Sequence, residues 1–544
     1  MSLASHTRRP AAPPAAELTG AMFIGSRRVT GAGAVAHSHD ARTGQLLEPA
    51  YAGGTPEDVA AACQAAEDAF DTYRNLHPWH RARFLETVAD NLTALTDALV
   101  ARAHQETGLP TARLTGEIAR TAGQLRMFAA VLTEGSWLDA RIDPAQPGRT
   151  PQPRPDIRQQ HIPLGPVAVF GASNFPLAFS VLGGDTASAL AAGCPVVVKA
   201  HDAHLGTSEF AAHAVRAAVV THKLPDGVFS LLVGDGPTLG TQLVTDPRIQ
   251  AVAFTGSRAV GLALAHTAAS RPQPVPVYAE MSSINPVVLM PGALAERATS
   301  LAEEFVASLT LGAGQFCTNP GLLLAVDGPD LQTFLQTASR AVAADAGATM
   351  LTPRIAKSYR VETETVASHP SVQVLARGAQ PDSAGPGQAV LMTARAADVI
   401  ADPDLQREMF GAAALVVRCD DPAQLAETLR RLEGQLTATL HTALTDTEDA
   451  RALLPLLERK AGRVLANGWP TGVEVGHAMV HGGPYPATTD ARTTSVGSRA
   501  IERFLRPVAY QDLPQELLPV ALRDDNPYNI PRRVDGEASP RPGS

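Results

Sequence analysis

One cysteine of the chain lies in a segment that could present a thiol to a substrate. Cys317 falls within residues 312–321, Gly-Ala-Gly-Gln-Phe-Cys-Thr-Asn-Pro-Gly, just after a long apolar helix pattern at residues 294–311. Glycine allows positive φ angles and a close approach of the backbone to a ligand. A thiol held there can attack a carbonyl carbon, whereas the alternative is a buried cysteine in a tight turn. The decision depends on which other groups the chain can place beside this thiol.

Two polar residues that could assist a thiol follow apolar, strand-like runs. Asn174 comes after the run at residues 167–170, and Glu280 follows the run at residues 275–279. An amide N–H aimed at a developing oxyanion lowers the barrier to its formation, although an asparagine at a turn also caps helices. Glu280 is either a capped surface acid or a general base whose pKa is raised by partial burial.

A second set of residues suits a nucleotide cofactor. Lys199 ends an apolar strand pattern, where it either extends its ammonium group to solvent or holds a ribose or an anion at the sheet edge. Asp202 follows three residues later. Gly256 and Ser257 end another strand pattern and open a helix, whose free N–H groups suit a pyrophosphate.

Histidines offer a possible metal site. The chain has 16 of them, and His477 and His481 are four residues apart. That spacing would suit a metal on a helix, but the flanking glycines argue against a helix and no third ligand is evident. No metal site is therefore expected.

Length and composition restrict the class of protein. A chain of 544 residues should form about two or three domains. The net charge of −9 offers no basic face, so nucleic-acid binding is not expected. No apolar run reaches the ~18–20 residues of a membrane span, so no membrane association is expected. Four scattered cysteines without a CxxC pair favour a reducing, cytoplasmic location.

The elements that must position these residues can be predicted from periodicity. Thr55 caps a first helix, and apolar helix stripes continue to residue 131, where we assign them to the core without a functional role. From residue 166, strand patterns at 167–170, 195–199, 228–233, 251–254 and 275–279 alternate with helix patterns at 177–192, 206–220 and 257–270. Such alternation predicts parallel βαβ units and a doubly wound sheet, whose ligands bind beyond the carboxyl ends of the strands.

Two further regions complete the prediction. A second run of strands and helices begins at residue 286 and contains Cys317 near its front, which indicates a second α/β domain. The proline-rich residues 139–163 are predicted to form a hairpin that reaches away from the body. Residues 1–20 are rich in alanine and proline and predict a disordered tail, and residues 512–544 have little core potential.

Five short motifs occur in one order along the chain. They are residues 173–176 (Ser-Asn-Phe-Pro), 197–199 (Val-Val-Lys), 254–257 (Phe-Thr-Gly-Ser), 314–317 (Gly-Gln-Phe-Cys) and 408–411 (Glu-Met-Phe-Gly). Together they resemble the aldehyde dehydrogenase superfamily, over about residues 22–504. Narrower variants at residues 279–286, 467–475 and 481–484 resemble its 2,5-dioxovalerate (α-ketoglutaric semialdehyde) dehydrogenase branch, which is similar to NADP-dependent fatty aldehyde dehydrogenases.

The resemblance implies a role for each matched residue. Cys317 would be the nucleophile that forms a thiohemiacetal and then a thioester. Asn174 and the Cys317 backbone N–H would hold the oxyanion, and Glu280 would activate the hydrolytic water. The cofactor would be NAD or NADP, held by the residues of the other motifs: Lys199, Asp202, Gly256, Ser257, Glu408 and Phe410.

The resemblance also implies a domain plan. Residues 21–138 and 164–283 would form the NAD(P)-binding domain, residues 284–492 the catalytic domain, and residues 139–163 with 493–544 a small β oligomerisation element that joins a homodimer or homotetramer. Ala412 replaces a proline that often follows the Glu408 motif. Asp202 favours NAD because it would repel a 2′-phosphate, whereas the fatty-aldehyde relatives favour NADP.

The substrate is left open between two classes of aldehyde. Oxidation of 2,5-dioxopentanoate to 2-oxoglutarate would need a cation for the far carboxylate, and the candidates are Arg158, Arg492, Arg499, His477 and His481. A long-chain or broad-specificity enzyme would instead need an apolar funnel, for which the candidates are Phe175, Phe179 and Trp469. A CoA-acylating enzyme, in which Glu280 would have no use, and a non-catalytic relative are the remaining alternatives.

Overall fold

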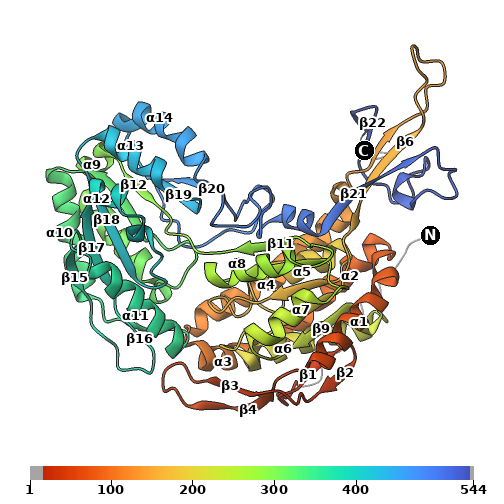
Figure 1. The fold of residues 1–544 in the computed structure, drawn as a ribbon, viewed down its shortest axis with the longest axis horizontal. Coiled ribbons are helices and arrows are strands. Elements are labelled where there is room, and N and C mark those ends of the chain that lie inside the picture. Colours follow the sequence, from red (N-terminus) through yellow and green to blue (C-terminus); the bar gives the residue numbers. More distant parts are fainter. Residues whose placement is uncertain (1–15, 540–544) are drawn as a thin grey trace, which may run out of the picture.

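The computed structural model describes residues 16–539, which form two α/β lobes and a small projecting sheet (Figure 1). The first lobe contains a seven-stranded sheet in the order β11-β10-β7-β8-β9-β1-β2. Its strands are β11 (Val277–Glu280), β10 (Ala251–Thr255), β7 (Val167–Phe170), β8 (Val196–Lys199), β9 (Phe229–Leu232), β1 (Met22–Ile24) and β2 (Arg27–Val29). The first five strands run parallel, so their carboxyl ends share one edge.

Helices cover both faces of this sheet. They are α1 (Pro56–Arg74), α2 (Pro78–Ala94), α3 (Thr96–Thr107), α4 (Thr111–Glu134), α5 (Gly184–Ala192), α6 (Leu205–Thr221), α7 (Thr241–Thr245) and α8 (Arg258–Ala269). The predicted cap of α1 is confirmed, because Thr55 and Asp58 form a capping box. The predicted helix at residues 177–192 is wrong in its first half, since the helix begins only at Gly184. Residues 177 and 178 instead donate their N–H groups to the Glu117 carboxylate.

The second lobe repeats the α/β plan with a sheet in the order β15-β17-β18-β13-β12-β19-β20. Its strands are β15 (Gln373–Arg377), β17 (Val390–Arg395), β18 (Ala413–Cys419), β13 (Leu322–Val326), β12 (Val287–Leu289), β19 (Gln435–His441) and β20 (Ala461–Ala466). Its helices are α9 (Pro291–Thr310), α10 (Pro329–Ala344), α11 (Pro353–Ala367), α12 (Ala396–Ala401), α13 (Pro422–Arg431) and α14 (Thr447–Glu458). The apolar pattern at residues 294–311 corresponds to α9.

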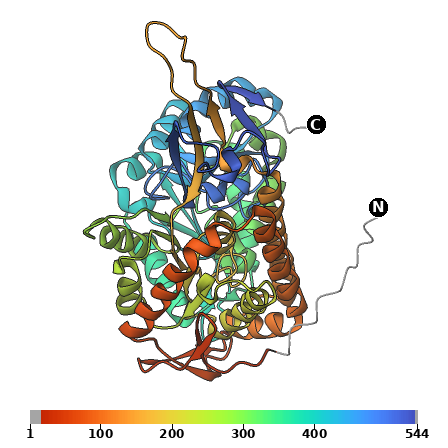
Figure 2. The ribbon, with the colours of Figure 1, turned by 90° about the vertical axis from the view of Figure 1, so that its right-hand side faces the viewer.

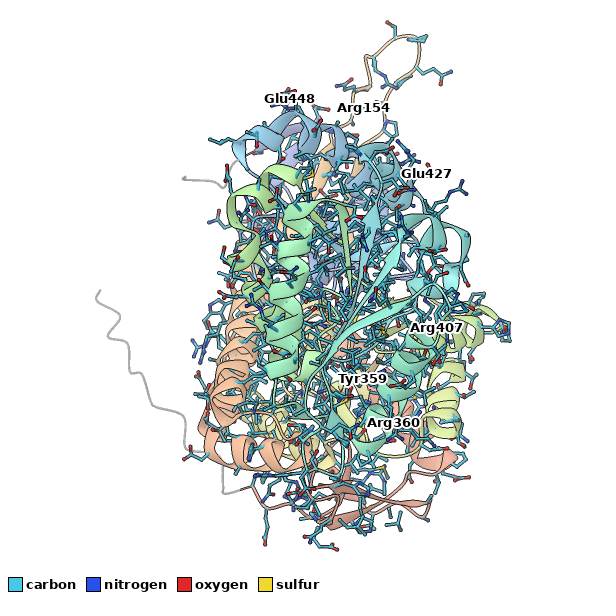
Figure 3. The ribbon with its side chains drawn as sticks, turned by 90° about the vertical axis from the view of Figure 1, so that its left-hand side faces the viewer. Arg154, Tyr359, Arg360, Arg407, Glu427 and Glu448 are labelled. Carbon is cyan, nitrogen blue, oxygen red and sulfur yellow. The ribbon has the colours of Figure 1, made fainter. Side chains whose placement is uncertain are left out.

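A third, five-stranded sheet projects from the first lobe (Figures 1 and 2), and its β21 contributes Leu505 to the core of that lobe. Its order is β21 (Leu505–Gln511), β6 (Ile157–Pro163), β5 (Arg141–Asp143), β22 (Arg532–Val534) and β23 (Glu537–Ser539). The predicted hairpin between β5 and β6 projects from it, and Figure 3 shows Arg154 at that end, far above Tyr359 and Arg360 of α11. The expectation of little core potential after residue 512 is wrong, because this segment supplies two strands and buries Leu522 and Ile530.

The N-terminal segment is anchored earlier than expected. Most of the predicted tail, residues 1–15, lies outside the described residues, but Thr19 donates from its backbone N (2.9 Å) and its Oγ1 (2.7 Å) to the buried Glu209. The hairpin of β3 (Val35–His39) and β4 (Leu46–Ala52) follows, and a short pair of β14 (Ala348–Thr349) and β16 (Pro386–Gly387) belongs to the second lobe. Among residues 16–539, no helix combines the length and the apolar character that crossing a membrane requires. The predicted α/β class, with two such lobes and a small β element, is confirmed.

Candidate functional site

The polar residues predicted at strand ends meet at one edge of the first sheet. Asn174 follows β7, Lys199 ends β8, Gly256 follows β10 and Glu280 ends β11. Because β7, β8, β10 and β11 are parallel, their carboxyl ends lie at the same edge. The second lobe closes over this edge and brings Cys317 to Glu280.

The backbone before Cys317 is held in an uncommon conformation. Gly312, Ala313 and Gly314 all have positive φ (58°, 58° and 70°), which is unfavourable for a residue with a Cβ atom. At Gly314 a Cβ atom would lie only 2.3 Å from the backbone of Gly411. Glycine is therefore required there to let the cysteine loop approach the segment that follows Glu408.

A short linker, residues 281–286, joins the two lobes and fixes the cysteine loop. Asn285 donates from Nδ2 to the carbonyl oxygens of Cys317 (2.8 Å) and Asn319 (2.9 Å). Ser283 donates from Oγ to Asn285 Oδ1 (2.9 Å) and to Gln435 Oε1 (2.9 Å). The same Gln435 oxygen accepts from the backbone N of residues 284 and 285. The linker is thus bonded to the second lobe immediately after Glu280.

Cys317, Glu280 and His481 form a buried polar cluster. His481 Nε2 lies 2.8 Å from Glu280 Oε1 and 3.4 Å from Cys317 Sγ. Ser495 donates from Oγ to the other Glu280 oxygen, Oε2 (2.7 Å). The His481 backbone N donates to Thr494 Oγ1 (2.9 Å), which holds the main chain at His481. The thiol is therefore in contact with a linked imidazole and carboxylate.

The groups of this cluster shift the pKa values of Cys317 and Glu280 in opposite directions. Burial raises the pKa of the Cys317 thiol well above its usual value, and the Glu280 carboxylate raises it further. Burial would also raise the Glu280 pKa, but the charge and hydrogen bond of His481 and the Ser495 hydroxyl outweigh it, so the Glu280 pKa lies below its usual value. The thiol is thus protonated at rest beside an ionised carboxylate.

The Asn174 side chain lies against the cysteine loop. Its Nδ2 donates to the Gln315 carbonyl (3.0 Å), and Asn174 is only 7% exposed. A stripe of charged residues on α4 holds the segment around it. Arg113 donates to the Asn174 carbonyl (2.8 Å), and one turn further Glu117 accepts the N–H groups of residues 177 (2.9 Å) and 178 (3.0 Å).

Aromatic rings form a wall beside the thiol. The Phe175 ring centroid is 5.2 Å from that of Phe179 and 5.5 Å from that of Phe316, and Phe179 lies 6.2 Å from His481. Phe175 and Phe179, two candidates for an apolar funnel, are thus part of this wall.

The predicted cofactor residues lie along the same sheet edge. Lys199 Nζ is 2.7 Å from Asp202 Oδ1. Gly256 and Ser257 are exposed at the N-terminus of α8. Glu408 accepts a hydrogen bond from the Ser283 backbone N (3.4 Å), and burial raises its pKa. Phe410 follows in the same loop, beside residues 283–284 and 314–316.

A comparison with protein-family models gives a match over residues 36–506, to the aldehyde dehydrogenase family. The chain belongs to the aldehyde dehydrogenase family. The match includes the second lobe, the linker, the first lobe without strands β1 and β2, and every residue of the Cys317 cluster.

Curated relatives agree with this assignment. The chain is 57% identical to α-ketoglutaric semialdehyde dehydrogenase 2 of Azospirillum brasilense, over 96% of this chain and 100% of the relative. It is 46% identical to α-ketoglutaric semialdehyde dehydrogenase of Acinetobacter baylyi, over 96% and 99%. This aldehyde dehydrogenase is therefore an aldehyde-oxidising oxidoreductase.

Solved structures share the fold. A mutant of aldehyde dehydrogenase C from Pseudomonas syringae, crystallised with NAD⁺ and octanal, superposes with a TM-score of 0.78 at 18% identity, covering 91% of this chain and 97% of that one. The 1-pyrroline-5-carboxylate dehydrogenase from Thermus, with bound NAD, gives 0.77 at 20% identity, covering 90% and 92%. These likenesses confirm the architecture of this aldehyde dehydrogenase.

Several candidate substrate residues do not lie in the Cys317 cluster. Arg492 is 90% exposed and pairs with Asp490. Trp469 packs against Phe305 and His441 in the second lobe instead of joining the aromatic wall.

The remaining candidate cations are also engaged or placed elsewhere. Arg158 is paired with Asp156 in the small sheet, and Arg499 is paired with Glu502. His477 is exposed in a loop without helical structure.

His481 is placed differently from the substrate role that the sequence indicated, because its ring contacts Glu280 and Cys317 and is fully buried. The sulfur, imidazole and carboxylate ligand atoms of this cluster lie within 4.8 Å of one another, which is also a set of atoms that zinc accepts. His477, the histidine that the sequence paired with His481, does not belong to this set.

Sequence reasoning missed the residues that support the site. Asn285, Ser495 and the α4 stripe of Arg113, Glu117 and Arg120 were not singled out. Charged residues at positions i, i+4 and i+7 of an otherwise apolar helix were the available signal, because such spacing puts three charges on one face.

Proposed function

We propose that the protein oxidises 2,5-dioxopentanoate to 2-oxoglutarate with NAD⁺, through a thioester on Cys317. The contact of Cys317 with Glu280 and His481, beside Asn174, carries the catalytic part of the proposal. The substrate is supported by the similarity to two α-ketoglutaric semialdehyde dehydrogenases over nearly the full chain.

The first half-reaction forms the thioester. The Cys317 thiol loses its proton to the Glu280–His481 pair, and the sulfur attacks the aldehyde carbon. The negative charge that develops on oxygen is held by the Asn174 side-chain amide and the Cys317 backbone N–H. Within residues 16–539, no hydrogen bond engages that N–H, so it remains available to the oxyanion. The nicotinamide, when bound, accepts the hydride that leaves the former aldehyde carbon, and this loss gives the thioester on Cys317.

The second half-reaction hydrolyses the thioester. Glu280 and His481 share a contact of 2.8 Å, so they take a proton from the attacking water as one unit. Collapse of the adduct releases the carboxylic acid and returns the thiolate, which regains the proton. A thiolate suits both halves because it is a strong nucleophile and a good leaving group.

The cofactor residues fit a dinucleotide. The exposed N–H groups at the start of α8 suit a pyrophosphate, and the partly buried Glu408 suits a ribose hydroxyl. The Asp202 carboxylate, 2.7 Å from Lys199 Nζ, occupies that cation and would repel a 2′-phosphate. We therefore expect a higher kcat/KM with NAD⁺ than with NADP⁺, and an equal or higher value with NADP⁺ would reject this preference.

The decisive assay supplies the purified full chain with 2,5-dioxopentanoate and either NAD⁺ or NADP⁺, and follows the reduced cofactor and 2-oxoglutarate. Cys317→Ala should abolish both signals, whereas the matched variant Cys419→Ala, which changes a cysteine at the end of β18, should retain them. Reduced cofactor formed by Cys317→Ala would refute the proposed nucleophile. Faster turnover of a long alkanal would favour the aromatic wall as the determinant of specificity.

A further inference from the structure

Two arginines from different lobes hold one loop, residues 470–473. Arg463 on β20 donates from Nη1 to the carbonyl of residue 472 (3.0 Å) and from Nη2 to that of residue 470 (2.7 Å). Arg120 on α4 donates from Nη1 to the carbonyl of residue 473. The loop therefore lies between two guanidinium groups.

This loop lies beside the nucleophile. The Gly472 N–H donates to Thr318 Oγ1 (3.3 Å), and Thr318 directly follows Cys317. Burial lowers the pKa of both Arg120 and Arg463, and a thiolate at Cys317 would act on both in the opposite direction. Both cations are thus close enough to interact with the group at which the reaction takes place.

Arg120 has donors that the protein does not use. Its Nε is buried and has no hydrogen-bond partner among residues 16–539, and the same is true of Arg463 Nε. Among the described residues, the one hydrogen bond of Arg120 leaves from Nη1, and its guanidinium carbon lies 5.7 Å from the centroid of the Phe179 ring in the aromatic wall. A buried donor without a partner is costly, so this group requires an explanation.

The other charges near Arg120 are only partly engaged elsewhere. Glu117 accepts two backbone N–H groups at Oε1, whereas its Oε2 is buried without a hydrogen-bond partner among residues 16–539 and its charge acts on Arg120. Arg113 donates to the Asn174 carbonyl and lies over Phe175 and Phe316. Glu474 is exposed. Arg120 is therefore the cation of this stripe with free hydrogen-bonding capacity.

We propose that Arg120, with Arg463 behind it, binds the carboxylate at the far end of the aldehyde. The inference rests on the proposed function and specifies its substrate class, short aldehydes that end in a carboxylate. A guanidinium group suits this task because its charge is permanent and its N–H fork matches a carboxylate. The aromatic wall then packs against the chain between the two ends of the substrate.

The test compares a charged aldehyde with a neutral one. The kcat/KM values of 2,5-dioxopentanoate, succinic semialdehyde and pentanal are measured for the wild type, Arg120→Gln, Arg120→Lys and Arg126→Gln. Arg126 is a matched control on the same helix, where it pairs with Asp90 at the surface. In Arg120→Gln, kcat/KM for the charged aldehydes should fall about 10- to 100-fold through KM, the loss expected for a charged hydrogen bond.

Pentanal distinguishes this role from a purely structural one. Its kcat/KM should change less than about threefold in Arg120→Gln, as for a neutral surface substitution, and Arg120→Lys should recover part of the charged-aldehyde activity. Equal losses for pentanal and the charged aldehydes would overturn the inference. Wild-type enzyme that oxidises pentanal but shows no preference for a carboxylate would overturn it as well, while leaving Cys317 chemistry intact. Failure to oxidise any aldehyde would reject the proposed function itself.

Discussion

At the residue scale, the reactivity of Cys317 depends on the charge of its neighbours. The Glu280 carboxylate stabilises the protonated thiol, and His481 in turn stabilises the Glu280 carboxylate. A protonated thiol is a poor nucleophile and is slow to oxidise or alkylate. The cluster therefore keeps the sulfur unreactive until a proton can pass to the Glu280–His481 pair.

Removal of the Glu280 charge should make the thiol more acidic. Burial raises the Cys317 pKa in both forms, but Glu280→Gln removes the second cause of the increase. The pH midpoint for alkylation of Cys317 by iodoacetamide should consequently move to lower pH. Glu474→Gln, which changes an exposed carboxylate in the loop near Arg120, is the control and should leave the midpoint unchanged. An unmoved midpoint in Glu280→Gln would contradict the coupling.

Removal of His481 should have the opposite effect on Glu280. Without the imidazole, burial is the dominant influence, so the Glu280 pKa should rise. Because the base is then protonated up to a higher pH, the pH profile of thioester hydrolysis should shift to higher pH in His481→Gln. His477→Gln is the matched control in an exposed position of the same loop. Identical profiles for the two variants would rule out this role of His481.

At the element scale, a buried carboxylate completes the start of α6. Glu106 on α3 accepts from the backbone N of Gly206 (2.8 Å) and Thr207 (2.9 Å) and from Thr207 Oγ1 (2.7 Å), and Arg102 balances its charge (2.9 Å). The first N–H groups of a helix have no partner within the helix. Glu106 therefore joins α3 to α6 by accepting hydrogen bonds from the backbone N–H groups at the start of α6, which have no partner within that helix.

Glu106→Ala should destabilise the first lobe by about 3–5 kcal/mol, because it leaves Arg102 buried without its partner. Urea unfolding followed by circular dichroism measures this loss. Glu86→Ala is the control, because Glu86 is about half exposed and lies 3.6 Å from Arg83 on α2. A loss no larger than that of the control would show that the interaction is dispensable.

The strands and helices could be predicted where the sequence has a clear apolar pattern. Strands β7, β8, β10 and β11 are short apolar runs with polar residues after them, so their positions and their shared edge could be predicted. His481 could not be placed, because it lies in a loop without periodicity and is 164 residues from Cys317. The helix pattern of α4 indicates a role in the core because its apolar residues dominate it, so the charged stripe of Arg113, Glu117 and Arg120 is not predicted. The roles of Arg120 and Glu117 can be inferred only once the segments that they contact are known, which are residues 470–473 for Arg120 and residues 177–178 for Glu117.

At the scale of the whole molecule, the small sheet has an unpaired edge. Within residues 16–539, strand β21 pairs with β6 on one side only, which leaves its other backbone groups available to another chain. The hairpin between β5 and β6 projects beside it (Figure 2). These features support the prediction of a homodimer or homotetramer.

Light scattering of the purified chain should give twice or four times the mass of one chain. Replacement of residues 147–153 by two glycines would shorten the hairpin and should weaken the assembly, so that its mass falls on dilution before that of the wild type. Both lobes should remain folded, because the deleted residues are exposed. A wild-type mass equal to one chain would reject the prediction.

The linker at residues 281–286 has a consequence for inactivation by heat. Glu280 belongs to the first lobe and Cys317 to the second, and the contacts of Ser283 and Asn285 with Gln435 fix their relative position. A small rotation between the lobes would separate the Glu280 carboxylate from the Cys317 sulfur without disrupting either sheet. Warming should therefore stop turnover while the far-ultraviolet circular dichroism is still intact, and cooling should restore it.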